Sequence, residues 1–273
     1  MAKPKVNFSR RDLLLTILCT LFAAANLAAV GSAGRRRAKE AVCLSNLRQW
    51  GAIFEMLAND NNGCFFNGEG SGNGYWWMDK LQAYNKDDRL RLCPEAPRTA
   101  EGVPLGEVNW SHTAWRAGRV YNGNGDIGSY GLNSWICNPR PGITGLWGRN
   151  PPKYGMSFYW RTCNVRNANT VPIFCGSWWV DFWPLPDDLP PPLLDGVPIP
   201  DSPGVNEMDR CCVDRHEGGL GCLFMDWSAR NVGIKELWTL KWHRSFNTAG
   251  PWTKAGGVHP TNWPKWMKDF KDY

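Results

Sequence analysis

The chain has almost no net charge beyond its first forty residues. Residues 1–40 hold eight of the 31 lysines and arginines but only two of the 25 acidic residues, so residues 41–273 carry 23 residues of each sign. A nucleic-acid-binding surface needs clustered positive charge, and this balance argues against nucleic acid as a partner. The basic excess instead flanks an uncharged apolar segment, which is where membranes and translocases respond to positive charge.

Charged residues are absent between Asp12 and Arg35, and most of residues 13–33 are apolar. This segment has 21 residues, more than the ~7–15 of a signal-peptide core and about the ~20 that a membrane-spanning helix needs. We therefore predict a basic tail at residues 1–12 and a transmembrane segment at residues 13–33. Two other interpretations stay open. The stretch SRRDLLL (9–15) has the paired arginines of a twin-arginine export signal, and GSAG (31–34) has the small residues that a signal peptidase accepts.

A helical pattern of apolar residues continues past this segment, at the spacing of an amphipathic helix. The stripe consists of Leu44, Leu47, Gly51, Phe54 and Ala58, with Trp50 and Leu57 beside it. The NDNNG stretch then ends the pattern with Gly63, a residue suited to a left-handed helix cap. We expect one helix from about Asp12 to Asp60, with residues 34–62 as the extramembrane continuation.

Long apolar runs are missing from residues 63–273, the expected globular domain. Short apolar stretches at residues 121–137 and 171–183 lie between turn residues and predict short strands. Residues 211–232 predict a meander: a strand to Asp214, a turn at HEGG, a strand through Phe224, a tight turn at DWS and another strand. Residues 235–243 and 264–270 predict short helices, and the proline-rich residues 184–207 an extended loop. The expected fold class is α+β, with one long helix packed on a small antiparallel sheet that carries long Gly-, Pro- and Trp-rich loops.

Motifs of catalysis and of metal binding are scarce. The sequence has no G-x-S-x-G nucleophile motif, no paired Cys-x2–4-Cys blocks and no calcium-loop spacing. Asp181, Asp187 and Asp188 can be compared with the paired carboxylates of glycosidases, but exposed acids are ordinary in and beside a proline-rich loop. His216 and Asp226 are more simply explained as residues that order two successive turns by hydrogen bonds than as a catalytic pair. We therefore expect no enzyme activity, no metal and no cofactor.

The ten cysteines include Cys19 in the apolar segment, which leaves nine for the rest of the chain. Many cysteines in a loop-rich extracytoplasmic domain indicate disulfides, but an odd number leaves at least one thiol free or paired between chains. Zinc at Cys211, Cys212 and Cys222 with His216 is an alternative that the spacing disfavours, because structural zinc ligands usually include closely spaced cysteine pairs.

Several short motifs follow one another along the chain. They are Phe8 with an acidic Asp12, a CLSNLRQ block that begins at Cys43, LRLCPEAP with Cys93 and Pro94, SYGLN at residues 129–133, and DRHEGGLGCLFMDW with His216 and Asp226. In these motifs and their order, from Phe8 to Val232, the chain resembles the pseudopilin-like proteins of type II secretion that carry a C-terminal H-x9-DG motif. The resemblance implies structural roles for Cys43, Asn46, Cys93, Pro94, His216 and Asp226.

The resemblance also implies a function. It implies a membrane-anchored structural or assembly component of a type II secretion or type IV pilus-like system, with a single pass through a bacterial inner membrane, a cytoplasmic N-terminus and a periplasmic main domain. The implied partners are the lipid bilayer and other pilin-like subunits or secretion machinery. Asn7 stands where the pilin leader needs Gly, so we expect cleavage between Asn7 and Phe8 to be absent or very slow. Trp227 likewise replaces the Gly of the histidine motif.

Tryptophan is frequent, at 17 residues. We expect most of the rings to fill the core, with their indole N–H groups hydrogen-bonded. Two adjacent pairs are candidates for stacking on a ligand: Trp76, Trp77, Trp178 and Trp179. Because neighbours in a strand face opposite ways, at most one ring of each pair can enter the core. An anchored carbohydrate- or peptide-binding module is therefore the alternative function, and a periplasmic hydrolase is a remote one.

Overall fold

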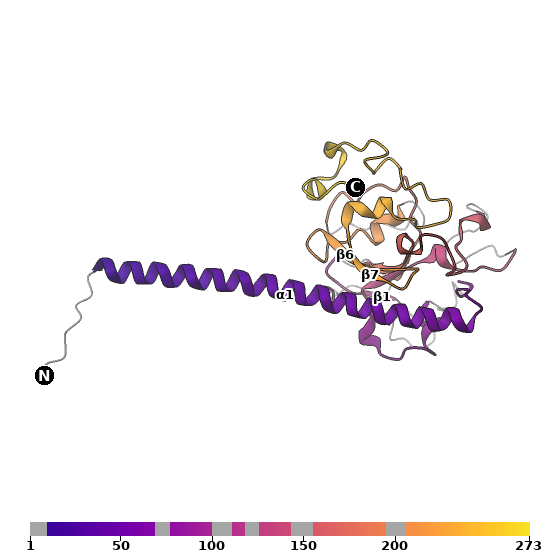
Figure 1. The fold of residues 1–273 in the computed structure, drawn as a ribbon, viewed down its shortest axis with the longest axis horizontal. Helices are drawn as coiled ribbons and strands as arrows, with labels where there is room; N and C mark the ends of the chain where they lie inside the picture. Colours follow the sequence, from indigo (N-terminus) through magenta and orange to yellow (C-terminus); the bar gives the residue numbers. More distant parts are fainter. Residues whose placement is uncertain (1–9, 69–76, 100–110, 118–125, 143–154, 195–205) are drawn as a thin grey trace. The chain divides into compact units, whose positions relative to one another are not determined.

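The computed structural model describes residues 10–68, 77–99, 111–117, 126–142, 155–194 and 206–273 (Figure 1). The chain divides into two compact units, Met1–Lys39 and Glu40–Tyr273. The first unit contains the beginning of helix α1, and the second contains the rest of α1 together with the strands found among the described residues.

Helix α1 runs without interruption over Arg10–Asp60. It begins two residues before the expected start and ends at the expected residue. Gly63 follows with a φ of +77°, and its N–H donates to the Ala58 carbonyl at 2.7 Å. The predicted left-handed cap is therefore confirmed.

From Glu40 onwards, α1 buries one face within the second unit. The buried side chains on this face are Cys43, Leu47, Trp50, Ile53, Phe54, Leu57 and Ala58. The predicted stripe is correct except at its start, where Cys43 is buried and Leu44 is only half-buried. The face repeats every three or four residues, as expected of a helix that lies on a sheet.

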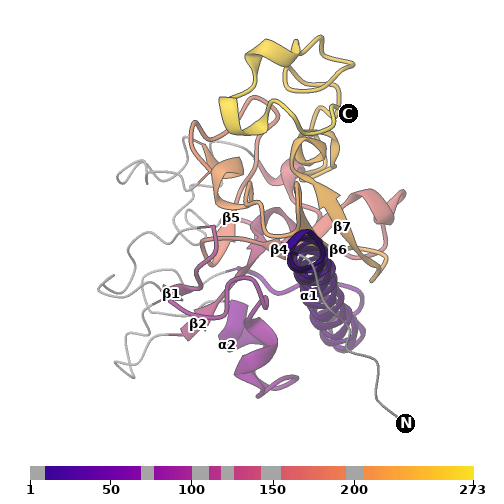
Figure 2. The ribbon, with the colours of Figure 1, turned by 90° about the vertical axis from the view of Figure 1, so that its left-hand side faces the viewer.

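A five-stranded sheet forms the centre of the second unit (Figure 2). Its strands are β3 (Tyr130–Asn133), β4 (Pro172–Gly176), β5 (Asp181–Phe182), β6 (Gly219–Phe224) and β7 (Ala229–Gly233), in the order β5-β3-β4-β6-β7. All neighbours are antiparallel except β3 and β5, which are parallel. Strands β1 (Trp115–Ala117) and β2 (Asp126–Gly128) form a separate antiparallel pair. The fold is α+β with a mainly antiparallel sheet.

The predicted meander is partly correct. The turn at HEGG, the strand through Phe224, the tight turn at DWS and the next strand correspond to the β6–β7 hairpin. The expected strand up to Asp214 is wrong, because residues 211–215 form no strand. This segment instead follows the 3-10 turn η5 (Glu207–Arg210).

The remaining helical elements are short. They are α2 (Trp77–Leu81) and the 3-10 turns η1 (Asp88–Arg91), η2 (Ser134–Ile136), η3 (Met156–Phe158), η4 (Ala168–Thr170), η6 (Ile234–Thr239), η7 (Pro260–Asn262) and η8 (Lys265–Met267). The short helices expected at residues 235–243 and 264–270 are only partly present, as the 3-10 turns η6 and η8. In the predicted loop, residues 184–194 and 206 have no helix or strand, and residues 195–205 lie outside the described residues.

Helix α1 approaches strand β6 closely. A Cβ atom added to Gly221 would lie 2.7 Å from Leu47 Cδ1 and 2.9 Å from Cys43 Sγ, both on α1. Such distances are shorter than any ordinary contact, so only glycine fits beneath the helix at this position. On the helix side, Gly51 similarly faces Leu223 of β6.

Tryptophan rings form much of the core. Fully buried rings are those of Trp50, Trp77, Trp115, Trp135, Trp183, Trp238 and Trp242. Six of them donate the indole N–H to a backbone carbonyl at 2.7–3.0 Å, as in the bonds from Trp77 to Val180 and from Trp50 to Leu90. The core-filling role expected for tryptophan is confirmed for these residues.

Among the described residues, no helix combines the length and the apolar character needed to cross a membrane.

Candidate functional site

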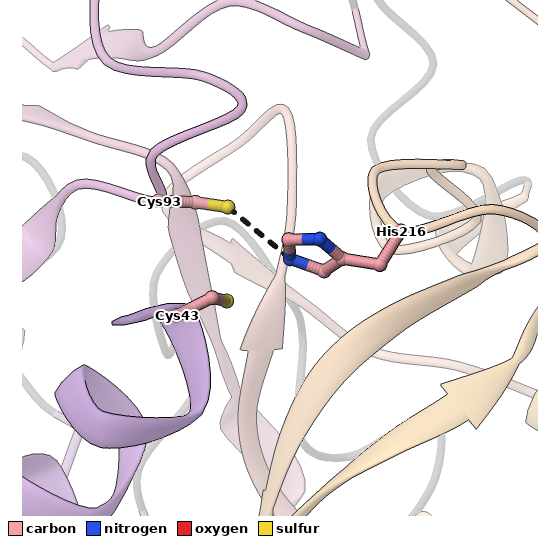
Figure 3. A group of neighbouring side chains, drawn as sticks. All are labelled: Cys43, Cys93 and His216. Carbon is pink, nitrogen blue, oxygen red and sulfur yellow. Dashed lines mark hydrogen bonds between the residues drawn. The ribbon is translucent and has the colours of Figure 1, made fainter. Parts of the chain in front are cut away.

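Three side chains with metal-binding or redox chemistry converge in the second unit (Figure 3). Cys43 comes from α1, Cys93 from the segment after η1, and His216 from the turn before β6. The two Sγ atoms and one imidazole nitrogen all lie within 4.8 Å of one another. Cys93 Sγ is 3.5 Å from His216 Nε2, and all three side chains are buried. We call this group the Cys43–Cys93–His216 cluster.

Neighbouring hydrogen bonds fix the two cysteines. Asn46, one helical turn after Cys43, donates its side-chain N–H to the Leu92 carbonyl at 3.0 Å. The backbone N–H of Cys93 donates to Ser129 Oγ at 2.5 Å. These bonds attach the Cys93 segment to α1 on one side and to the start of β3 on the other, while Pro94 follows half-buried.

A tight turn places His216. The backbone N–H of His216 donates to the Gly219 carbonyl at 2.9 Å, and Asp214 Oδ1 accepts the Gly218 N–H at 2.8 Å. Glu217 and Gly218 both have positive φ angles, +53° and +86°. The expectation that His216 belongs to an ordered hairpin turn is therefore confirmed, but its ring faces the two cysteines, which the sequence did not indicate.

The environment of the cluster favours ionisation of Cys93 first. The hydrogen bond from the Cys43 thiol, together with His216 and the charge of Arg215, holds the pKa of Cys93 well below its ordinary value. The hydrogen bond to Cys93 and burial raise the pKa of Cys43 well above its ordinary value. Tyr130 Oη donates to Cys43 Sγ at 3.2 Å. A negative charge on Cys93 Sγ is thus stabilised by the Cys43 thiol, by His216 and by the charge of Arg215.

Arg215, next to His216, is buried and donates hydrogen bonds to backbone carbonyls. Its Nε donates to the Ser111 carbonyl at 2.6 Å, and other guanidinium N–H groups donate to the carbonyls of Ser129, Ser177 and Thr113. No carboxylate lies within ion-pair distance of it in the part of the chain that the structure describes. Burial lowers the pKa of Arg215, and the sulfurs of Cys93 and Cys43 oppose that shift. Among the described residues, the thiols of Cys93 and Cys43 are therefore groups that can balance the positive charge of Arg215.

Asp226 occupies the turn between β6 and β7, away from the cluster. Its Oδ1 accepts the backbone N–H of Ser228 at 3.0 Å and the Ser228 hydroxyl at 2.6 Å. The predicted turn-capping role is confirmed. No hydrogen bond joins it to His216 among the described residues. Trp227 has a φ of +66°, a left-handed conformation that explains why glycine suits this motif position.

Most of the other candidate metal ligands and carboxylates are placed in strands or make hydrogen bonds within the fold. Cys222 lies opposite Cys175 in the β4–β6 ladder, and His216 is grouped with Cys43 and Cys93 rather than with Cys211, Cys212 and Cys222. All ten thiols are free. Asp188 is buried and accepts the N–H groups of Leu185 and Met208.

Asp181 is likewise buried, near Ser134 and Arg210, whereas Asp187 is exposed. The two buried acids are therefore occupied by hydrogen bonds of the fold. The comparison with glycosidases gains no support from these contacts.

The candidate stacking tryptophans differ in exposure. Trp77 is fully buried and donates to the Val180 carbonyl at 2.7 Å, so it offers no ring face to a ligand. Trp178 and Trp179 are half-buried, and the Trp178 indole donates to the Asp209 carbonyl at 2.7 Å. Trp76 lies outside the described residues. A role in ligand stacking stays a prediction for Trp178 and Trp179.

The leader residues are not described in the same detail. Asn7 and Phe8 lie outside the described residues. Asp12 lies within α1, but its side chain is outside the described part of the structure.

Comparison of the chain with protein-family models, with curated proteins and with solved structures finds no match.

Proposed function

We propose that the protein is a membrane-anchored, pilin-like structural subunit of a type II secretion or type IV pilus-like assembly, and that it is not an enzyme. The observation that carries the proposal is helix α1, which has 51 residues and whose part from Glu40 onwards packs on an antiparallel-rich sheet. A pilin-like subunit needs such a helix, because one half serves assembly in the membrane and the other half holds the globular domain.

The composition of the first half of α1 supports the same function. No charged residue occurs between Asp12 and Arg35. Leu14, Leu18 and Val30 are 67%, 66% and 71% exposed in the isolated chain. Side chains of this kind are stable on a helix surface when lipid or another apolar helix covers them. The proposed setting is a bacterial inner membrane, with the N-terminus cytoplasmic and the main domain outside the cytoplasm.

The motif residues support the proposal in a second way. Residues of three separate motifs meet in one place, because Cys43, Cys93 and His216 lie together and Asn46 bonds the Cys93 segment. They fix the position of the second half of α1 on the sheet. A structural subunit requires this fixed attachment, since force or packing on the helix must reach the globular domain.

Site-specific photo-crosslinking tests the proposal. We expect a photoreactive amino acid at position 18 to crosslink, in intact cells, to a second copy of this chain or to another protein with an N-terminal apolar helix. The same group at Met56, which is 45% exposed on α1 within the second unit, serves as the matched control and should give few such products. Crosslinks from position 18 to lipid alone would contradict a subunit role and leave a simple anchor.

A further inference from the structure

The proposed function makes no chemical use of the Cys43–Cys93–His216 cluster. Two thiols and an imidazole from sequence positions 50 and 123 residues apart converge with their side chains 1%, 0% and 6% exposed. Simple core packing does not require three such groups to face one another. Their shared property is affinity for soft metal ions.

We propose that Cys43, Cys93 and His216 form a binding site for one thiophilic metal ion, and that Cu(I) is the ion that this site fits. Ligand atoms bound at ~2.0–2.3 Å to one metal can be no more than ~4.6 Å apart. The three donor atoms lie within 4.8 Å of one another, so they are already close to that spacing.

The number of ligands favours Cu(I) over zinc. Zinc in structural sites is almost always bound by four ligands in a tetrahedron. Among the described residues, no fourth His, Cys, Asp or Glu belongs to this group. The small exposed fraction of His216 leaves little access for water as a replacement. Cu(I) is a closed-shell ion that is satisfied by three ligands in a plane, and thiolates and imidazole are among its preferred donors.

The charge of the surroundings favours the same ion. Two thiolates and Cu(I) sum to one negative charge, and the buried guanidinium of Arg215 supplies one positive charge beside them. With Zn²⁺ in its place, the positive charge of Arg215 would stay uncompensated in the interior, which is costly. Tyr130 Oη, 3.2 Å from Cys43 Sγ, would donate to a ligating sulfur from outside the coordination sphere.

The binding step is a simple ligand exchange. Cys43 and Cys93 each release one proton to solvent as their sulfurs bond to the metal, and neutral His216 donates a nitrogen lone pair. Copper enters and remains as Cu(I), so no oxidant or reductant is consumed. The bound ion joins α1, the Cys93 segment and the turn before β6, and therefore locks the helix onto the sheet.

The test uses the full-length chain in detergent, reduced and free of oxygen, titrated with Cu(I) against the chelator bathocuproine disulfonate. We expect one equivalent of Cu(I) to be retained, with X-ray absorption showing two sulfur ligands and one nitrogen ligand. Cys43→Ser, Cys93→Ser and His216→Asn should each weaken retention by at least ~100-fold. Cys163→Ser, which alters a half-buried thiol outside the cluster, should leave retention unchanged.

Several results would overturn the proposal. They are retention of copper by all three variants, an all-sulfur coordination shell in the unmodified chain, tighter retention of zinc than of Cu(I), and a Cys43–Cys93 disulfide in protein isolated without reductant from its own cells. Protection of Cys43 and Cys93 from N-ethylmaleimide by one equivalent of Cu(I) would support it. The absorption and protection measurements use the unmodified chain, so they decide the question even if a variant fails to fold.

Discussion

Replacing Trp50 by alanine is expected to lower the free energy of unfolding of the second unit by about 3–5 kcal/mol. The Trp50 ring is 2% exposed, its centroid lies 5.4 Å from those of both Trp77 and Phe174, and its indole N–H donates to the Leu90 carbonyl. Alanine is a strong helix former, so the loss would come from the contact of α1 with the sheet and not from the helix itself.

The measurement is thermal unfolding of the full-length chain in detergent, followed by near-ultraviolet circular dichroism. At ~2–4 °C per kcal/mol, we expect Tm to fall by roughly 6–20 °C. The matched control is Met56→Ala, because Met56 lies on the same helix and is 45% exposed; its Tm should change by no more than ~2 °C. Equal small changes in both variants would show that α1 does not depend on this face for its position.

The contribution of His243 to stability is expected to decrease as the pH falls from 6.5 towards 3. Burial, and secondarily the charge of Lys241, lowers the pKa of His243 from 6.5 to about 3. The His243 ring stacks on that of Phe158, with 4.4 Å between the ring centroids, and neither ring nitrogen has a hydrogen-bond partner among the described residues. Above pH 6.5 the imidazole is neutral in both states. Below pH 6.5, His243 becomes protonated in the unfolded chain, whereas in the folded chain it stays neutral down to about pH 3. This difference lowers the free energy of unfolding by up to about 4 kcal/mol.

The pH dependence of urea unfolding, compared between variants, measures this effect. Relative to the unmodified chain, His243→Leu should gain stability as the pH falls from 6.5 to 4, whatever its stability at neutral pH. His112→Gln changes an exposed histidine and should keep the slope of the unmodified chain. Burial raises the pKa of Asp209 to about 7, so Asp209 adds stability as the pH falls. Because this contribution is the same in both proteins, it cancels when the variant is compared with the unmodified chain. A slope unchanged in His243→Leu would mean that His243 takes up its proton in the folded state.

The local features of the fold were predictable from the sequence, and the long-range ones were not. Helix α1 and the β6–β7 hairpin depend on apolar spacing, on Gly63 and on turn residues, all of which act within a few positions. The parallel pairing of the two-residue strand β5 with β3 depends on contacts across about fifty residues, which no periodicity records. The same limitation explains the incorrect strand before Asp214, where two cysteines and Val213 have strand-forming composition but pack as an irregular segment.

The candidate site shows the same limitation. Reasoning from sequence proximity grouped His216 with Cys211, Cys212 and Cys222, whereas the fold brings it to Cys43 and Cys93. The sequence did contain one indication of this grouping, because Cys43, Cys93 and His216 each belong to a different motif in the series that follows one another along the chain. Arg215 gave no signal at all, since a buried arginine bound to carbonyl oxygens looks like any other arginine in a sequence.

The central claim is that the chain is anchored by the uncharged segment of α1 between Asp12 and Arg35, and peptide mapping of cell fractions tests it most directly. Trypsin cleaves after Arg11 and Arg35, so one peptide, residues 12–35, contains the whole apolar segment. We predict that the protein stays with the membranes after a high-salt wash and that this peptide is recovered from them together with peptides of the globular domain. A soluble chain that begins near Gly34 and lacks this peptide would contradict the account.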